Sequence, residues 1–88
     1  MPKRNTIPEA KEVTERFLRA FEELRYRGLE KTKSNFSKHT GLVTSSNMDR
    51  MRNEQKEPTI SNILLLNKVY GVSLRWIMTG EGEFIEEK

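Results

Sequence analysis

Apolar side chains recur along this chain at helical spacing, in short stretches that glycine or proline separates. From about Pro8 to about Arg27 they stand three or four positions apart, so that one face of a helix is buried. Four glycines each follow such a stretch directly, and glycine commonly ends a helix; they are Gly28, Gly41, Gly71 and Gly80. The pattern predicts an all-α fold of five short helices with no strands.

The second and third of these helices are expected to pack against each other across a tight turn. The second spans about 33–40, with Thr32 or Ser34 as its N-cap. The third follows Thr44, its expected N-cap, and ends near Asn53. We expect a small set of apolar side chains to hold the two helices at a fixed angle: Phe36, Leu42 or Val43, Met48 and Met51.

Two more helices are expected after a polar loop. Thr59 caps a fourth helix that Gly71 ends, and a fifth helix runs from Ser73 to Gly80. Apolar side chains on both helices are expected to join the core, at least in part: Ile60, Ile63, Leu64, Leu66, Tyr70, Leu74, Trp76, Ile77 and Met78.

The length of the chain fits one domain. Its 88 residues, of which 34% are apolar, bury a modest core and leave no room for a deep substrate cavity. We expect a single domain over 1–88, with a core at about 8–80. The tail 81–88 is expected to be a short extended arm or a disordered segment.

Residue types that support catalysis or metal binding are sparse. There is no cysteine, and His39 is the only histidine, so a metal site is not expected. Adjacent glutamates such as Glu22 and Glu23 point apart on a helix and are solvated surface rather than an acid/base pair. No run of apolar residues approaches the length of a membrane span, and the first ten residues do not show the apolar stretch expected of a signal peptide. We therefore expect a cytoplasmic protein with no enzymatic activity and no cofactor.

Charge is distributed unevenly along the chain. Residues 1–56 carry 13 Lys and Arg against 8 Asp and Glu, a net charge of +5, whereas residues 57–88 carry 3 against 5, a net charge of −2. A basic region favours polyanions, because neutralised phosphates release their counterions. Five basic residues surround the second and third helices and favour double-stranded DNA as the partner: Lys33, Lys38, Arg50, Arg52 and Lys56.

The expected third helix has the side chains of a helix that enters the DNA major groove. Between its apolar positions it carries short polar groups and one guanidinium, which reach base edges or phosphates: Ser45, Ser46, Asn47, Asp49 and Arg50. A second helix packed across it, at 33–40, would hold it at the required angle.

Over residues 13–82 the sequence resembles the phage repressor and Cro-like (XRE-type) helix-turn-helix family. The match is strongest in PTISNILLLNKVYGVSLRWIMTGEGEF, from Pro58 to Phe84. The stretch TKSNFSKHTG is similar to the second helix of that family, with Phe36 in the usual leucine position and Ser37 in the usual alanine position. The resemblance implies a compact five-helix repressor-like domain whose second and third helices form the helix-turn-helix.

The resemblance also implies roles for individual residues. It places Ser45, Ser46 and Arg50 toward the bases. We add Asn47 to this base-facing set because it is a short polar side chain on the same expected exposed face. It places Lys33 and Asn53 at the DNA backbone, where Lys38, Arg52 and Lys56 join them as basic side chains. The sequence departs from the family at Gly41-Leu42-Val43-Thr44, where the turn is one residue longer. The Met48/Met51 pair fixes the register of the third helix, so we place the extra residue in the turn.

Two functional hypotheses follow. The first is a sequence-specific transcriptional regulator, a repressor of phage or mobile-element type, that binds its operator as a homodimer. The dimer surface is expected where apolar groups lack an obvious place in the core, at Leu65, Val69, Phe84 and Ile85. The alternative is an antitoxin-like interaction protein on the same scaffold, which neutralises a partner protein and binds DNA secondarily.

Overall fold

The computed structural model describes residues 8–86, and five helices make up most of this range. α1 is the longest, and no strand occurs between residues 8 and 86. The expectation of an all-α fold is confirmed. The helices are α1 Pro8–Tyr26, α2 Lys33–His39, α3 Ser46–Arg52, α4 Ile60–Tyr70 and α5 Leu74–Thr79.

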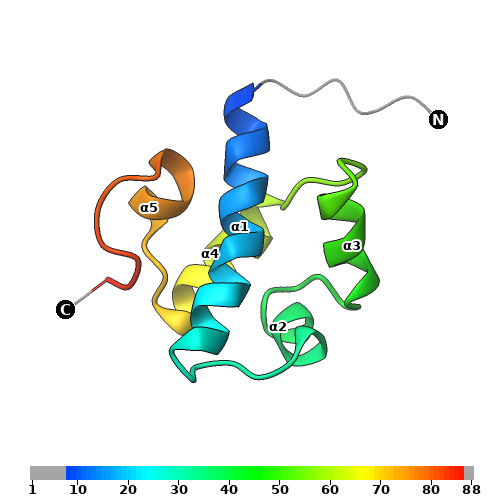
Figure 1. The fold of residues 1–88 in the computed structure, drawn as a ribbon, viewed down its shortest axis with the longest axis horizontal. Coiled ribbons are helices and arrows are strands. Elements are labelled where there is room, and N and C mark those ends of the chain that lie inside the picture. Colours follow the sequence, from blue (N-terminus) through cyan, green and yellow to red (C-terminus); the bar gives the residue numbers. More distant parts are fainter. Residues whose placement is uncertain (1–7, 87–88) are drawn as a thin grey trace.

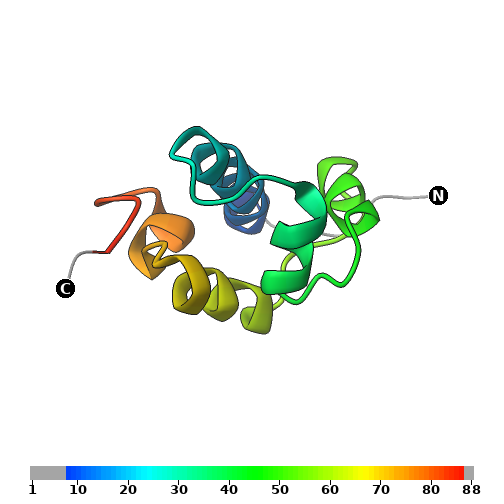
Figure 2. The same ribbon diagram turned by 90° about the horizontal axis from the view of Figure 1, so that it is seen from below.

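The helices surround a core to which all five contribute buried side chains. Figure 1 shows α1 upright in the centre with α4 behind it. Seen from below, α2 and α3 occupy one end of the molecule, and α5 with the C-terminal segment occupies the other (Figure 2). The two ends are therefore separate surfaces.

Aromatic rings fill the centre of the core. The fully buried Phe36 of α2 lies with its ring centroid 5.6 Å from that of Phe17 and 5.1 Å from that of Phe21, both on α1. It also stacks on Tyr70 of α4 at 5.8 Å. These contacts bury large apolar surfaces and hold α2 against α1 and α4.

A buried carboxylate ties the loop after α1 to the ends of α2 and α4. Glu30 is nearly fully buried, accepts a hydrogen bond from the Tyr70 hydroxyl, and lies 3.4 Å from Nδ1 of His39. The backbone N–H of Lys31 donates to its other oxygen at 2.8 Å. Burial by itself would raise the pKa of Glu30, but the hydrogen bonds from Tyr70, Lys31 and His39 outweigh it and hold this pKa below its ordinary value. The carboxylate is therefore satisfied in its ionised form.

Most expected helix boundaries are confirmed, and one cap is not. Thr32 and Thr59 cap α2 and α4 through their side chains. Thr44 is not the cap of α3, since Ser45 occupies that position without a side-chain hydrogen bond. The Thr44 hydroxyl instead pairs with the Ser46 hydroxyl at 2.8 Å, so it does not satisfy a backbone N–H at the start of α3.

Three residues that were predicted to join the core are exposed, and one residue that was not assigned to the core is buried in it. Ile60, Leu64 and Met78 are exposed. Phe84, assigned by its sequence position to a dimer surface, is only 8% exposed and packs edge-to-face on Trp76 at 4.7 Å. An exposed Ile60 follows from its place at the first residue of α4, on the side away from the buried Leu66.

The segment after α5 returns to the body of the protein as an extended arm. The backbone N–H of Ser73 donates to the carbonyl of Phe84, and that of Glu86 donates to the carbonyl of Gly71, both at 2.8 Å. An isolated antiparallel bridge pairs Val72 with Ile85. Through residue 86 the segment is thus an extended arm paired with residues 71–73, and residues 87–88 of the expected tail lie outside the described residues.

Phe84→Ala tests whether this arm is part of the folded core. Removing the ring from its place against Trp76 should lower the free energy of unfolding by about 3 kcal/mol, because a buried cavity replaces it. Denaturant titration followed by circular dichroism measures the change. The matched control is Leu29→Ala, an exposed side chain, which should change stability by less than about 0.5 kcal/mol. Equal effects of the two substitutions would contradict the arm's role.

Candidate nucleic-acid interface

The turn between α2 and α3 reverses the chain through two residues with positive φ. Gly41 has φ of 79° and Val43 has φ of 75°. Between them, Leu42 enters the core, and its backbone N–H donates to the carbonyl of Ser37 at 2.8 Å. Of the two alternatives for the apolar contact in this turn, Leu42 is therefore the one that is buried, whereas Val43 is 77% exposed.

Side-chain amides hold this turn on both sides. Nδ2 of Asn47, on α3, donates to the carbonyl of Leu42 at 2.6 Å. Nδ2 of Asn62, on α4, donates to the carbonyl of Thr40 at 2.7 Å. These bonds satisfy turn carbonyls that the helices leave unpaired, and they fix α3 relative to α4.

Asn62 is a positioning residue that sequence reasoning missed. Besides holding the turn, it completes a capping box at the start of α4, because its Oδ1 accepts from the backbone N–H of Thr59. A carbon added at Gly41 would lie 3.3 Å from Nδ2 of Asn62 and 3.1 Å from a methyl of Leu65, so the turn sits directly on α4. The signal in the sequence was Thr59 followed three positions later by an amide side chain.

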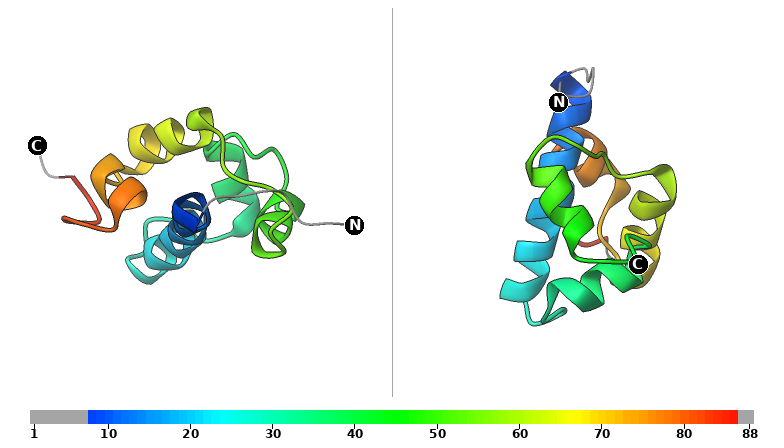
Figure 3. Two further views of the ribbon diagram at one scale, coloured as in Figure 1. Left: turned by 90° about the horizontal axis from the view of Figure 1, so that it is seen from above. Right: turned by 90° about the vertical axis from the view of Figure 1, so that its right-hand side faces the viewer.

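α3 has one buried face and one exposed face. Met48 and Met51 are buried against the core. Successive residues of a helix are about 100° apart, so the face opposite Met48 and Met51 is formed by positions 46, 49 and 50 and by the C-cap at position 53. These side chains are exposed: Ser46, Asp49, Arg50 and Asn53. In the right-hand view of Figure 3, α3 lies at the front of the molecule, and no other helix is drawn in front of it.

Charged side chains meet on this exposed face. Oδ1 of Asp49 lies 4.0 Å from Nζ of Lys33 at the start of α2 and 3.7 Å from the guanidinium of Arg52. The fold thus brings Lys33 to the surface of α3. Between residues 31 and 56 the sequence has six Lys and Arg against two Asp and Glu, a net charge of +4. We use the name α3 surface for the exposed side chains of α3 and its C-cap together with Lys33, namely Lys33, Ser46, Asp49, Arg50, Arg52 and Asn53.

Not every residue expected at the interface lies on the α3 surface. Ser45 and Asn47 are partly buried, and the amide of Asn47 is engaged in the turn. Lys38 is exposed on the side of α2 away from the buried Phe36, and Lys56 is partly buried in the loop after α3. The α3 surface therefore unites Lys33, Ser46, Arg50, Arg52 and Asn53 of the expected set.

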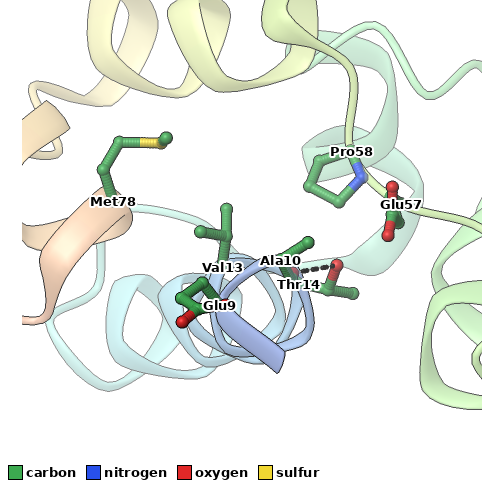
Figure 4. Close-up of a pocket in the computed structure, with 7 residues that line it drawn as sticks. All are labelled: Glu9, Ala10, Val13, Thr14, Glu57, Pro58 and Met78. Carbon is green, nitrogen blue, oxygen red and sulfur yellow. Dashed lines mark hydrogen bonds between the residues drawn. The ribbon is translucent and has the colours of Figure 1, made fainter. Parts of the chain in front are cut away.

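A separate cleft of about 300 Å³ lies between the start of α1, the end of α5 and the residues before α4 (Figure 4). Its floor is mainly apolar, and the two ionisable side chains that line it are the carboxylates of Glu9 and Glu57. The Thr14 hydroxyl in it already donates to the carbonyl of Ala10 at 3.1 Å. Two carboxylates repel phosphate, so this cleft is not suited to a nucleic-acid backbone.

Comparison with other proteins assigns nothing to either surface. No family model, curated protein or solved structure matches this chain. Within residues 8–86, no group of three or more His, Cys, Asp or Glu side chains is placed to hold a metal ion. None of the helices in that range is both long enough and apolar enough to cross a membrane.

Val43→Gly tests the geometry of the turn. A β-branched residue at φ of 75° is strained by about 1–2 kcal/mol, and glycine removes this strain at the cost of a more flexible unfolded chain. Because the Val43 side chain is largely exposed, its removal sacrifices little packing, and the free energy of unfolding should rise by about 1 kcal/mol.

The control for this substitution is Val43→Ala, which removes the branched side chain but keeps Cβ. It should give less than half of the gain. Thermal unfolding of the three proteins at equal concentration distinguishes the outcomes. A loss of stability in Val43→Gly would mean that the turn does not hold this residue in the left-handed conformation.

Proposed function

We propose that the chain is a sequence-specific DNA-binding regulator of the phage repressor and Cro-like helix-turn-helix type, in which α2 and α3 are the two helices of the motif. The observation that carries this proposal is the α3 surface: a polar, exposed helix face with Arg50 on it, mounted through Met48 and Met51 on the core. A regulator of this kind acts in the cytoplasm by occupying an operator, and the proposal assigns it no enzymatic activity.

The dimensions and chemistry of α3 support entry into the major groove. This groove is about 12 Å wide and admits one α-helix. α3 has seven residues, and its exposed face carries one long guanidinium between short polar side chains, so the helix can approach the bases closely. Arg50 matches the paired acceptors O6 and N7 of guanine, and Ser46 matches several base edges.

The hydrogen bond of Asn47 changes its proposed role. Its amide N–H already bonds to the Leu42 carbonyl within the turn. A base contact that used this N–H, or that rotated the amide toward a base, would break a bond that positions α3, at a cost of about 1 kcal/mol. We therefore assign Asn47 to holding the turn and assign base contacts to Ser46 and Arg50. Ser45 is the N-cap of α3 and is partly buried, so less of its side chain is available to a base.

The basic side chains around α3 would bind the phosphates on either side of the groove. Lys33 projects from the first residue of α2, beside α3, where it can meet one strand. Asn53 and Lys56 follow the C-terminal end of α3, so they can meet the other strand. Arg52 is the last residue of α3 and approaches the same carboxylate as Lys33, that of Asp49, so it would meet the strand that Lys33 meets. Lys38 is the most remote of the expected contacts, because it lies on the far side of α2.

The proposal includes a homodimer on DNA, because one short helix specifies only a few base pairs. Burial of Phe84 removes it from the expected dimer surface, and Leu65 and Ile85 are partly buried. Val69 remains exposed on α4, and Ile60 on the same helix is 76% exposed. Ile60 lies about 180° from Val69 around the helix, whereas Leu65 lies one turn before Val69 on the same side. The side of α4 that carries Leu65 and Val69 is therefore the apolar surface that we assign to the second copy.

Arg50→Ala and Lys33→Ala should affect DNA binding differently. Removing Arg50 should cost about 1–3 kcal/mol on the preferred duplex and little on scrambled DNA, because the side chain would no longer reach a base. Removing Lys33 should weaken all duplexes alike and make the logarithmic salt slope shallower by about one for each phosphate that it no longer neutralises. Titrations at several salt concentrations, on a duplex selected from a random pool and on a scrambled one, measure both.

Arg75→Ala is the matched control, since Arg75 is exposed on α5 at the other end of the molecule. It should leave the ratio of specific to non-specific affinity unchanged. An unchanged ratio in Arg50→Ala would show that Arg50 does not face the bases. If the unmodified protein bound no duplex, the proposed function itself would be wrong.

Sedimentation with and without the selected duplex tests the dimer. We expect two copies on each duplex and a selected sequence with two inverted half-sites about one helical turn apart. Val69→Glu should reduce the occupancy by two copies while leaving the fold intact, because the side chain is exposed in the monomer. One copy bound to a sequence without internal symmetry would exclude this arrangement.

A further inference from the structure

Asp49 is an acidic side chain among the basic side chains of the α3 surface. Its side chain is 62% exposed, and it lies between Lys33 and Arg52 on the α3 surface. Helical geometry places it on the same exposed face as Arg50, the next residue. Any DNA that contacts Arg50 in the major groove therefore also meets the carboxylate of Asp49.

Stability does not account for this carboxylate. Its distances of 4.0 Å to Lys33 and 3.7 Å to Arg52 are at the long end for ion pairs, and exposed pairs of this kind contribute little to folding. Its charge also repels phosphates, so it weakens binding to DNA of arbitrary sequence. The carboxylate raises the affinity for DNA only where a hydrogen-bond donor of the DNA faces it.

We infer that Asp49 is a specificity-determining residue that accepts a hydrogen bond from the N4 amino group of a cytosine in the major groove. This inference rests on the proposed function and assigns part of the operator's sequence. An aspartate accepts from cytosine N4, whereas thymine offers it only an acceptor and a methyl group. The N6 donor of adenine stands beside the N7 acceptor, which repels a carboxylate, so cytosine is the better partner. Because Arg50 matches guanine and is the neighbouring residue, the cytosine belongs to the guanine's own base pair or to an adjacent pair.

Lys33 and Arg52 reduce the electrostatic cost of this contact. Both cations stand within 4.0 Å of the carboxylate, so the charge that approaches the DNA is partly neutralised. The same arrangement limits non-specific binding, because the negative charge of Asp49 offsets part of the attraction between these two cations and the phosphates. Asp49 thus lowers affinity for random DNA and raises it at one base pair.

The test is Asp49→Asn, measured on three duplexes: the selected one, the same duplex with the cytosine replaced by thymine, and a scrambled one. The unmodified protein should prefer cytosine over thymine by about tenfold, the usual scale for one mismatched pair. The variant should reduce this preference to about twofold, because an amide both donates and accepts. Its affinity for scrambled DNA should rise about threefold, with a salt slope steeper by about one.

Glu81→Gln is the matched control, because its side chain is 69% exposed and pairs with Arg75 of α5 at 3.2 Å. It removes the same charge and should leave the cytosine preference and the salt slope unchanged. Circular dichroism confirms that both variants are folded. As a second readout, selection from a random pool with Asp49→Asn should no longer return the cytosine at one position of each half-site.

Two results would overturn the inference. If Asp49→Asn increases affinity for all three duplexes by the same factor, Asp49 is a repelling charge and contacts no base. If selection with the variant returns the original sequence, the cytosine is not recognised through Asp49. In both cases the unmodified protein still binds its selected duplex, so the proposed function stands. If the unmodified protein binds no duplex, the proposed function and the inference fail together.

Discussion

The ring of Phe36 contacts the aromatic rings of α1 and α4, and the position of α2 depends on these contacts. Phe36 is fully buried among Phe17, Phe21 and Tyr70. Once α2 is held there, the turn that follows begins at a defined place, beside the amide of Asn62. An aromatic cluster of this kind costs several kcal/mol to disrupt, so it determines the placement of every element up to α3.

From α2 onward, the chain uses short-range interactions to place α3. Leu42 is buried, Asn47 holds its carbonyl, and Met48 and Met51 complete the contact with the core. Met48 and Met51 lie on one side of α3, and the side that faces solvent carries only polar and charged residues. The packing thus produces a rigidly mounted, exposed helix, which is what recognition of the major groove requires.

The sequence predicted those features that depend on neighbouring residues. Helix number, the caps at Thr32 and Thr59, and the burial of Met48 and Met51 all follow from periodicity and capping chemistry. The cap of α3 did not follow, because the positive φ of Val43 alters the approach of Thr44 to the helix.

Periodicity and capping rules do not predict features that depend on contacts between distant segments of the chain. Phe84 lies beyond the last helix, and only its contact with Trp76 shows that it belongs to the core. The proximity of Asp49 to Lys33 joins two helices across the turn, and no spacing rule predicts it. Asn47 was predicted to be an exposed amide, although it holds the carbonyl of Leu42 only five residues earlier, because the positive φ of Val43 in the intervening turn is not predicted by these rules.

The most direct test of the central claim is a map of backbone amide chemical shifts, recorded by NMR as the selected duplex is added to the protein. The account predicts that the largest changes occur at the start of α2 and along the α3 surface, with the arm at Phe84 and the cleft at Glu57 little affected. Changes centred on α5 or on the cleft, with α3 unaffected, would contradict it.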